Sequence, residues 1–276
     1  MDRYAVIGNP IAHSKSPRIH GLFATQTGEA LRYEALLAPL DGFVTTVDAF
    51  RAAGGRGLNI TVPFKLEAFA YATRRTPRAE AAGAVNTLAF GPDGVLGDNT
   101  DGAGILRDIT VNLACPVAGR RVLLLGAGGA ARGCILPLLL AEPASLTIAN
   151  RTTAKAEALA AEFARLLSCA VATRPTASSF AALAGQQFDV VINATSASLA
   201  DAAPDLPAGL YAPGSLAYDM MYGKGDTPFL AAARAQGAGH LADGLGMLVE
   251  QAAESFALWR GVRPDTAPVL AALRAG

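Results

Sequence analysis

The amino-acid sequence predicts an α/β fold arranged as two α/β domains in series. Before residue 100, short apolar stretches typical of strands alternate with amphipathic stretches typical of helices, which implies a layered domain with a mostly parallel sheet. A second alternating run begins at Arg121, and its first strand leads directly into a glycine-rich turn. At 276 residues the chain is long enough for two modest domains.

The first domain alternates regularly between the two kinds of element. Strands are predicted at residues 4–7, 32–37, 57–60 and 84–90, and helices at residues 17–27, 43–53 and 65–73. Every predicted helix therefore stands between two predicted strands, which is the order expected for strands that run parallel. Ligands of such sheets bind beyond the carboxyl ends of the strands, so the loops after residues 7 and 60 are candidate sites.

The second domain opens with an apolar strand at residues 121–125, followed by a turn made of Gly126, Ala127, Gly128, Gly129, Ala130 and Ala131. Gly126 permits a tight turn, Gly128 lets backbone N–H groups approach a pyrophosphate, and Ala131 occupies a position where the helix packs closely on the sheet. A helix at residues 133–141 adds unpaired N–H groups and a positive dipole end, and a strand at residues 145–149 follows. This order of elements predicts a Rossmann-type dinucleotide-binding domain.

The end of the second strand of this domain indicates which dinucleotide binds. A site that prefers NAD usually has a carboxylate there, whereas this chain has Asn150, Arg151 and Thr152, with Lys155 one turn further on. A guanidinium suits the 2′-phosphate of NADP, which it can hold through charge-assisted, bidentate hydrogen bonds. If Arg151 and Lys155 were ordinary surface cations, they would oppose the dipole of the helix that begins here. The sequence therefore favours NADP over NAD.

The rest of the chain continues the alternation and then ends in helices. A helix at residues 153–167 has its apolar residues on one face, and residues 189–193 form a short apolar strand. Thr227 and Pro228 mark the start of another helix, while the last helices, at residues 244–259 and 264–274, have no strand after them. The loops after residues 7, 60, 125 and 193 all follow strands, so we expect them to line a cleft between the domains.

Composition and charge exclude several functional classes. The formal net charge is zero and no block of like charge occurs, which argues against nucleic acid or a membrane surface as a partner. No apolar run is long enough to span a bilayer, and the first strand begins too early to leave room for a signal peptide. The three cysteines fit neither a disulfide framework nor a zinc pattern, and the histidines form no ligand cluster, so no metal is expected. We therefore expect a soluble, cytoplasmic protein, either a monomer or a homodimer.

Two polar clusters follow strands of the first domain. The loop after the first strand carries Ser14 and Ser16, and Ser16 suits the N-cap of the next helix. Two hydroxyls beside a helix N-terminus would also suit a substrate carboxylate. The strand at residues 57–60 leads into Thr61 and then into Lys65, a cation at a helix start, where the dipole disfavours it. A lysine partly removed from water can exchange a proton with a substrate, although most lysines are simply exposed.

Asn86 and Asp101 lie in two further polar segments, whose residue types are common in turns. Asp101 also suits the N-cap of a helix predicted at residues 102–112. Taken singly, none of these clusters identifies an enzyme.

The motifs are specific as an ordered set. The chain carries, in this order, GNPIAHSKSP (8–17), NITVPFK (59–65), GAVNT (83–87), NTDG (99–102), GAGGAA (126–131), NRT (150–152), NATS (193–196), DMMY (219–222) and DGLGMLVEQ (243–251). This set resembles the shikimate dehydrogenase family over nearly the whole chain. It departs from the family pattern at Gly21, where asparagine is frequent, and at Ala197 and Ser198, where a glycine often follows the NATS motif.

The resemblance implies reduction of the C3 ketone of 3-dehydroshikimate to shikimate with NADPH, a step of aromatic amino-acid biosynthesis. It assigns substrate binding to Ser14, Ser16, Thr61, Lys65, Asn86, Asp101, Tyr222 and Gln251. It assigns cofactor binding to the six turn residues 126–131 and to Asn150, Arg151, Thr152, Lys155, Met220 and Gly244. The C-terminal helices would close the first domain, so that residues 1–100 with 245–276 bind substrate and residues 101–244 bind NADP.

Within this family pattern Lys65 and Asp101 form the catalytic pair. Hydride delivery to C3 makes an alkoxide, which needs a proton and a positive charge nearby; protonated Lys65 supplies both, and Asp101 orients it. A quinate or mixed quinate/shikimate dehydrogenase is the nearest alternative, but such relatives often prefer NAD through an acidic residue where Arg151 stands. A non-catalytic NADP-binding sensor is another alternative, although it would need neither the pair nor the two serines.

Overall fold

The computed structural model describes the chain except for residues 168–170, 196–201, 224 and 276. Ser196 of the NATS motif and the departures at Ala197 and Ser198 therefore lie outside the described residues. The chain divides into two compact units: unit 1 comprises Met1–Gly104 and Leu248–Gly276, and unit 2 comprises Ile105–Met247. Among the helices that the structure describes, none is both long and apolar enough to cross a membrane.

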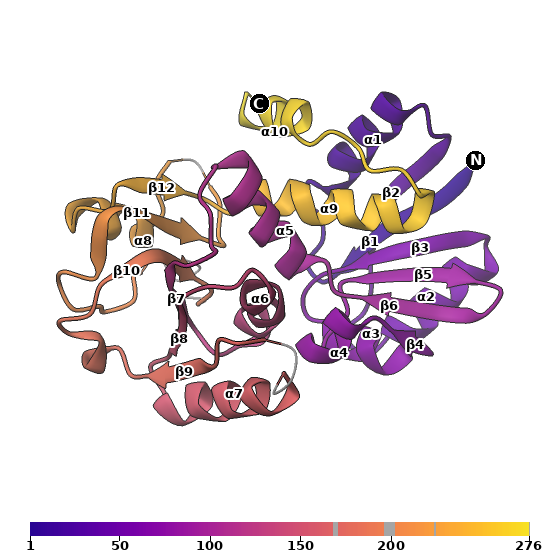
Figure 1. The fold of residues 1–276 in the computed structure, drawn as a ribbon. Helices are drawn as coiled ribbons and strands as arrows, with labels where there is room; N and C mark the ends of the chain where they lie inside the picture. Colours follow the sequence, from indigo (N-terminus) through magenta and orange to yellow (C-terminus); the bar gives the residue numbers. More distant parts are fainter. Residues whose placement is uncertain (168–170, 196–201, 224, 276) are drawn as a thin grey trace. The chain divides into compact units, whose positions relative to one another are not determined.

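Unit 1 is built on one sheet (Figure 1). Its strands are β1 (Asp2–Gly8), β2 (Leu31–Leu37), β3 (Gly55–Ile60), β4 (Arg74–Arg75), β5 (Thr87–Gly91) and β6 (Gly94–Asp98). Its helices are α1 (Ser16–Thr27), α2 (Phe43–Ala52), α3 (Lys65–Tyr71), α4 (Pro77–Ala82) and α10 (Ala267–Arg274). The chain leaves unit 1 within α5 (Asp101–Arg107) and returns within α9 (Leu245–Arg260), so each of these helices is shared between the units.

The strand order in unit 1 is β2-β1-β3-β5-β6-β4. Strand β1 pairs in parallel with β2 and β3, as the alternation of strands and helices predicts, and β4 pairs in parallel with β6. Strand β5 runs antiparallel to both of its neighbours. The single strand predicted at residues 84–90 is thus half of a hairpin, which turns through Pro92 and Asp93 between the paired residues Gly91 and Gly94.

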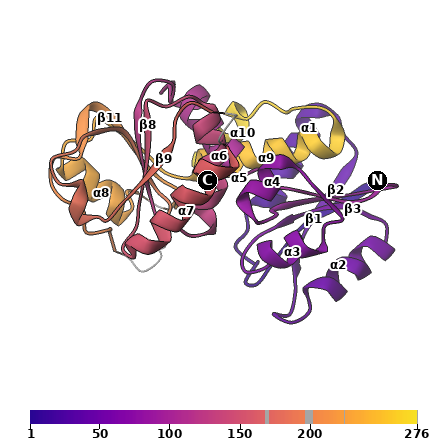
Figure 2. The same cartoon turned by 60° about the horizontal axis from the view of Figure 1, so that its bottom comes forward.

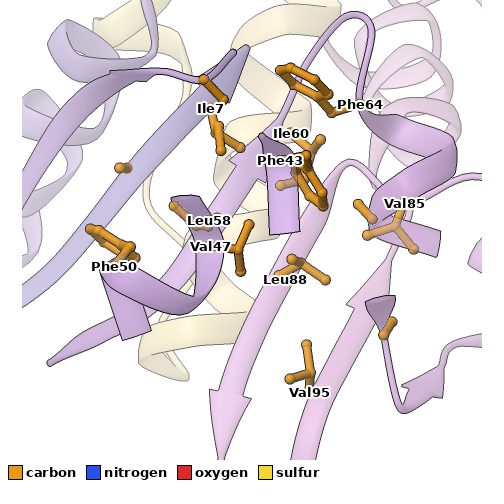
Figure 3. Packing of buried hydrophobic residues seen from close by; sticks show 14 of the residues in the cluster. Ile7, Phe43, Val47, Phe50, Leu58, Ile60, Phe64, Val85, Leu88 and Val95 are labelled. Atoms are coloured by element: carbon orange, nitrogen blue, oxygen red, sulfur yellow. The ribbon is translucent and has the colours of Figure 1, made fainter. Parts of the chain in front are cut away.

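One face of this sheet is covered by α2 and α3 through a continuous apolar cluster (Figure 3). The strands contribute Ile7, Leu58, Ile60, Leu88 and Val95, and the helical side contributes Phe43, Val47, Phe50 and Phe64. The rings of Phe43 and Phe64 stack with centroids 5.2 Å apart, and each buried side chain of this size contributes about 1.5–3 kcal/mol. Phe64 is fully buried in this cluster, and the next residue, Lys65, is the first residue of α3.

An aromatic cluster holds α9 against the N-terminal part of unit 1. Trp259 stacks on Tyr4 with ring centroids 4.6 Å apart, and Phe256 meets the edge of Phe23 at 5.7 Å. His20 is fully buried within this cluster and stacks on Tyr33 at 4.2 Å. These contacts carry residues near the C-terminus to the same sheet as the first strands.

Unit 2 is built on a second sheet, with the order β12-β11-β10-β7-β8-β9, in which every pairing is parallel. Its strands are β7 (Arg121–Leu125), β8 (Ser145–Ala149), β9 (Pro175–Ser178), β10 (Phe188–Asn193), β11 (Tyr211–Asp219) and β12 (His240–Ala242). Helices α6 (Gly129–Leu140) and α7 (Thr153–Leu166) lie on one side of the sheet, and α8 (Pro228–Ala235) lies on the other (Figure 2). This is the predicted Rossmann-type arrangement.

Local signals in unit 2 are confirmed in part. The helix predicted to begin at residue 133 is α6, which begins at Gly129 because the last residues of the glycine-rich turn already belong to the helix. Strands β7 and β8 have the predicted bounds, and the Thr227 hydroxyl accepts a hydrogen bond from the N–H of Leu230 at the start of α8, as an N-cap should. The helix predicted at residues 102–112 is instead α5 followed by a π-helical turn at Asp108–Asn112. Such turns are rare and have no simple sequence signature.

Candidate active site

Lys65 and Asp101 meet in unit 1. Lys65 is the first residue of α3 and Asp101 the first residue of α5, and Nζ of Lys65 lies 2.6 Å from Oδ2 of Asp101. The two side chains are 33% and 15% exposed, so a ligand can still reach the ammonium. The alternative role of Asp101 as an N-cap is wrong: its carboxylate faces Lys65, and the side chain of Asn99 accepts the backbone N–H of Asp101 at 3.2 Å.

Asn86 and Gln251 lie beside this pair. Nδ2 of Asn86 donates to Oδ1 of Asp101 at 2.8 Å and to the hydroxyl of Thr100 at 2.9 Å, and it lies 3.4 Å from Oε1 of Gln251. Gln251 comes from α9 and donates to the carbonyl of Leu248. Four residues from separate segments of the sequence, Lys65, Asn86, Asp101 and Gln251, therefore form one polar cluster.

Ser14 and Ser16 both lie at the start of α1, but the N-cap position is occupied by Lys15, which makes no side-chain cap hydrogen bond. Ser16 is the first residue of α1 and is buried, and burial raises the pKa of its neighbour Tyr33 despite a hydrogen bond from Ser16 to the phenol. Oγ of Ser14 accepts the backbone N–H of Ser16 at 3.3 Å. The interpretation of Ser16 as the cap is thus wrong, because Ser14 provides the local acceptor and Ser16 points to Tyr33.

Thr61 directly follows β3 and is half-buried. Its backbone N–H donates to the carbonyl of Ile7, so it lies beside the end of β1, where the loop with the two serines begins. Asn59, which alternation along the strand places on the same side as Thr61, is buried, and its amide binds Thr87 and Ser255. The amide of Asn59 therefore links β3 to β5 and to α9 inside unit 1.

In unit 2 the glycine-rich turn borders a cavity of about 1130 Å³. Gly126 has φ 107°, and a Cβ there would lie 3.0 Å from the carbonyl oxygen of Ala194, so glycine is required. A Cβ at Gly128 or Gly129 would meet nothing within 4 Å, which leaves the N-terminus of α6 open. Ala131 is fully buried. The cavity is lined by the turn residues Gly126, Ala127, Gly128, Gly129 and Ala130, together with Asn150 and Arg151.

Arg151 and Lys155 stand at the start of α7, and both are exposed. Among the described residues, no carboxylate pairs with either cation, and Asn150 donates to the carbonyl of Thr152 at 3.0 Å to shape the loop. Two unpaired cations beside a helix N-terminus and an open glycine turn suit a ligand with several phosphates. The residues of unit 2 thus fit a dinucleotide that carries a 2′-phosphate.

Met220, Tyr222 and Gly244 also belong to unit 2, whereas the two serines belong to unit 1. The backbone N–H of Gly244 donates to Met221 at 3.0 Å, and a Cβ at Gly244 would overlap the carbonyl of Met220. Only glycine therefore allows these two segments to touch. Burial raises the pKa of the half-buried Tyr222, and the charge of Asp243 adds to this rise.

Two residues close to the polar cluster of Lys65 and Asp101, Thr87 and Ser255, were not recognised from the sequence. The hydroxyl of Thr87 donates to Oδ1 of Asn86, and the hydroxyl of Ser255 accepts from the amide of Asn59. Ser255 lies one helical turn after Gln251, a spacing that places both on one face of a helix and was the available signal. Within the described part of the chain, no group of His, Cys, Asp and Glu side chains could hold a metal ion.

Comparison with known proteins identifies the family. The chain is 72% identical over 274 residues to the shikimate dehydrogenase (NADP(+)) of Aromatoleum aromaticum, covering 99% of this chain and 97% of that protein. The chain belongs to the shikimate dehydrogenase family. Family models described as the shikimate dehydrogenase substrate binding domain, shikimate / quinate 5-dehydrogenase and the shikimate 5'-dehydrogenase C-terminal domain match residues 6–88, 110–201 and 244–274.

Solved structures agree with this membership. A shikimate 5-dehydrogenase from Thermus thermophilus, in complex with NADP(H) and shikimate, superimposes with a TM-score of 0.83 at 33% identity, covering 100% of this chain and 99% of that chain. An Ael1 enzyme from Pseudomonas putida superimposes with a TM-score of 0.91 at 55% identity, covering 99% of this chain and 98% of that chain. The shikimate dehydrogenase fold thus extends over the whole of both units.

Proposed function

We propose that this shikimate dehydrogenase reduces 3-dehydroshikimate to shikimate with NADPH, reversibly, in the shikimate pathway of aromatic amino-acid biosynthesis. The observation that carries the proposal is the 2.6 Å pair of Lys65 and Asp101, in a chain 72% identical to an NADP-dependent shikimate dehydrogenase. NADPH, when bound, supplies the hydride. The protein's own residues must then supply a proton and positive charge at the reacting oxygen.

Lys65 is the proton donor in this mechanism. Its ammonium is close enough to Asp101 to be oriented by it, yet one third of the side chain remains accessible. As negative charge develops on the C3 oxygen, the ammonium stabilises it and then transfers a proton; in the reverse direction the neutral amine takes the proton from the hydroxyl of shikimate. The carboxylate of Asp101 lies beside the ammonium and orients it.

We assign the substrate contacts in two groups. Ser14 and Ser16, with Tyr222 assisting, hold the carboxylate, as hydroxyl donors beside the N-terminus of α1 are suited to do. The ring hydroxyls contact Thr61, Lys65, Asn86, Asp101 and Gln251. The position of Asn86 and Gln251 next to the catalytic pair supports this second group.

We assign NADP to unit 2. The open backbone at Gly128 and Gly129 and the N-terminus of α6 suit the pyrophosphate. The 2′-phosphate contacts Asn150, Arg151, Thr152 and Lys155, and the nicotinamide contacts Met220 and Gly244. Support for the phosphate assignment comes from Arg151, an exposed cation that lines the cavity, and from the exposed Lys155 in the first turn of α7.

Three further features are part of the proposal. Unit 1 corresponds to the substrate domain and unit 2 to the NADP domain; the boundary expected after residue 100 and the one after Gly104 differ only within the start of α5. The protein works in the cytoplasm, which its three widely spaced cysteines support because they fit no disulfide framework. It acts as a monomer or a homodimer.

Initial rates of NADPH formation test the function. Shikimate and quinate are each assayed with NADP+ and with NAD+ by absorbance. Strong turnover only with shikimate and NADP+ is the expected result. Comparable turnover of quinate or with NAD+ would move the enzyme to mixed specificity, and no turnover in any pairing would favour a non-catalytic sensor.

A further inference from the structure

A line of hydrogen bonds between buried and half-buried side chains of unit 1 extends from Tyr33 to Thr87, close to the catalytic pair. The phenol of Tyr33 donates to Oδ1 of Asn59 at 2.7 Å. The amide of Asn59 donates in turn to Oγ of Ser255 at 2.8 Å and to Oγ1 of Thr87 at 3.1 Å. The hydroxyls of Ser255 and Thr87 are themselves 2.8 Å apart. The line therefore joins α9 to the start of β5.

Asn86 connects this line to Asp101, and the orientation of its amide is fixed. Oδ1 of Asn86 accepts from the hydroxyl of Thr87 and from the backbone N–H of Thr100, each at 2.9 Å. Because a backbone N–H can only donate, the amide oxygen must face Thr100. Nδ2 must then face Oδ1 of Asp101, 2.8 Å away, while Lys65 binds Oδ2.

The line is isolated from solvent. Thr87 and Ser255 are 0% exposed, and Asn86 is 2% exposed. A buried donor or acceptor that loses its protein partner cannot replace it with bulk water, so its neighbours must shift to find new partners. Loss of one hydroxyl here is thus transmitted to the amide of Asn86.

We propose that Thr87 and Ser255 are positioning residues for the reaction: through Asn86 they hold Asp101 in the orientation in which it meets Lys65. Neither hydroxyl contacts the catalytic pair directly. The proposal rests on the proposed function, since it assigns Lys65 and Asp101 to the chemistry. It adds a support for that chemistry that reaches from α9, the helix that also delivers Gln251.

Replacement of the hydroxyl at one position separates positioning from packing. Thr87→Val keeps the shape of the side chain and removes the hydroxyl, whereas Thr87→Ser keeps the hydroxyl and removes a methyl group. We expect Thr87→Val to lower kcat by about tenfold, and Thr87→Ser to restore at least half of the wild-type value. Thr266→Val is the matched control, because it removes another buried hydroxyl of unit 1, bound to Glu250, and should leave kcat within about twofold.

A double-mutant cycle provides a readout that a merely structural role would not move. In the Asp101→Asn background the carboxylate is absent, so Thr87→Val should change kcat by less than about twofold. Ser255→Ala should follow the same pattern as Thr87→Val: it should lower kcat in the wild-type background and change kcat by less than about twofold in the Asp101→Asn background. If Asp101→Asn turns over too slowly to measure, Asn86→Ala replaces it, because Thr87 then has no amide to orient.

The outcomes distinguish this inference from the function it rests on. A wild-type protein that does not oxidise shikimate overturns the proposed function itself. An active wild type with normal kcat in Thr87→Val overturns the positioning role alone. A tenfold loss that persists unchanged in both backgrounds also overturns it, because the hydroxyl would then act independently of Asp101.

Discussion

The ammonium of Lys65 and the carboxylate of Asp101 lie 2.6 Å apart although 36 positions separate them in the sequence. Two helix starts create this pair, one after β3 and one after β6. Asp101 and Lys65 each occupy the first position of a helix, where the dipole favours the carboxylate and disfavours the ammonium. The ion pair with Asp101 therefore offsets the unfavourable interaction between the ammonium of Lys65 and the dipole of its own helix.

Removal of the ammonium tests the role of Lys65. We expect Lys65→Ala to lower kcat by about 10²–10⁴-fold, the usual contribution of a general acid, with a much smaller change in KM for shikimate. Initial rates with saturating NADP+ measure both constants. The affinity for NADP+, measured by fluorescence titration, should not change because the cofactor is assigned to unit 2. Near-normal turnover would remove Lys65 from the mechanism.

Arg151 is expected to determine the cofactor. Arg151→Asp replaces a cation at the edge of the cavity with an anion, and should weaken NADP+ binding by about 1–3 kcal/mol through lost charged hydrogen bonds. KM for NADP+ and for NAD+ is measured with the same substrate. Arg165→Asp changes another exposed arginine, in the last turn of α7, and should leave both constants unaltered. An unchanged preference in Arg151→Asp would contradict the assignment of the 2′-phosphate.

Gly246 should be intolerant of any side chain. A Cβ there would overlap the carboxylate of Asp108, which is buried and accepts a hydrogen bond from the phenol of Tyr218 at 2.7 Å. We expect Gly246→Ala to lower the free energy of unfolding by about 1–3 kcal/mol, as overpacking does. Gly21→Ala is the matched control, because Gly21 is also helical, has nothing within 4 Å of the added Cβ, and should stabilise by up to about 1 kcal/mol. Scanning calorimetry distinguishes the two, and equal Tm values would refute the overlap.

His20 should make unit 1 less stable in mild acid. Burial lowers the pKa of His20 from 6.5 to about 3. Below pH 6.5 the unfolded chain therefore binds a proton that the folded unit does not, and the free energy of unfolding falls by about 1.4 kcal/mol per pH unit until about pH 3. Above pH 6.5 this contribution is fully present.

The single tryptophan of the chain allows this to be measured locally. Trp259 lies 5.5 Å from the ring of His20, so its fluorescence during urea unfolding reports on unit 1. The wild type is compared with His20→Leu across the range below pH 6.5. We expect the variant to lose less stability per pH unit than the wild type; parallel curves would show that other groups cause the dependence.

Strong local signals predicted strands β7, β8 and β10 of unit 2, whereas β9, β11 and β12 were not predicted. Strands β7 and β8 are short apolar runs bounded by turns, and their bounds agree with the prediction. Strand β11 was missed because Pro213 and Gly214 interrupt it, and β4 because two arginines carry no apolar pattern. The β5–β6 hairpin was missed although its turn residues, between Gly91 and Gly94, are typical of one.

The candidate site, too, could be predicted only in part from the sequence. The residues that the family motifs name were visible in the sequence, and the structure brings Lys65, Asn86, Asp101 and Gln251 together. The local capping interpretations of Ser16 and Asp101 failed because tertiary partners, Tyr33 and Lys65, compete for the same side chains. The spacing from Gln251 was a signal for Ser255, but its contact with Thr87 could not be predicted, since that contact depends on how α9 packs.

Unit 1 is interrupted in the sequence by the whole of unit 2, and this has a consequence for biosynthesis. When the ribosome has made residues 1–104, the faces of Tyr4 and Phe23 that later receive Trp259 and Phe256 have no covering helix. Unit 2 is synthesised next and is continuous, so it can fold while the first segment waits. The enzyme can therefore complete unit 1 only after nearly the entire polypeptide has emerged, and the helix that packs last against the first strands, α9, is also the one that carries Gln251.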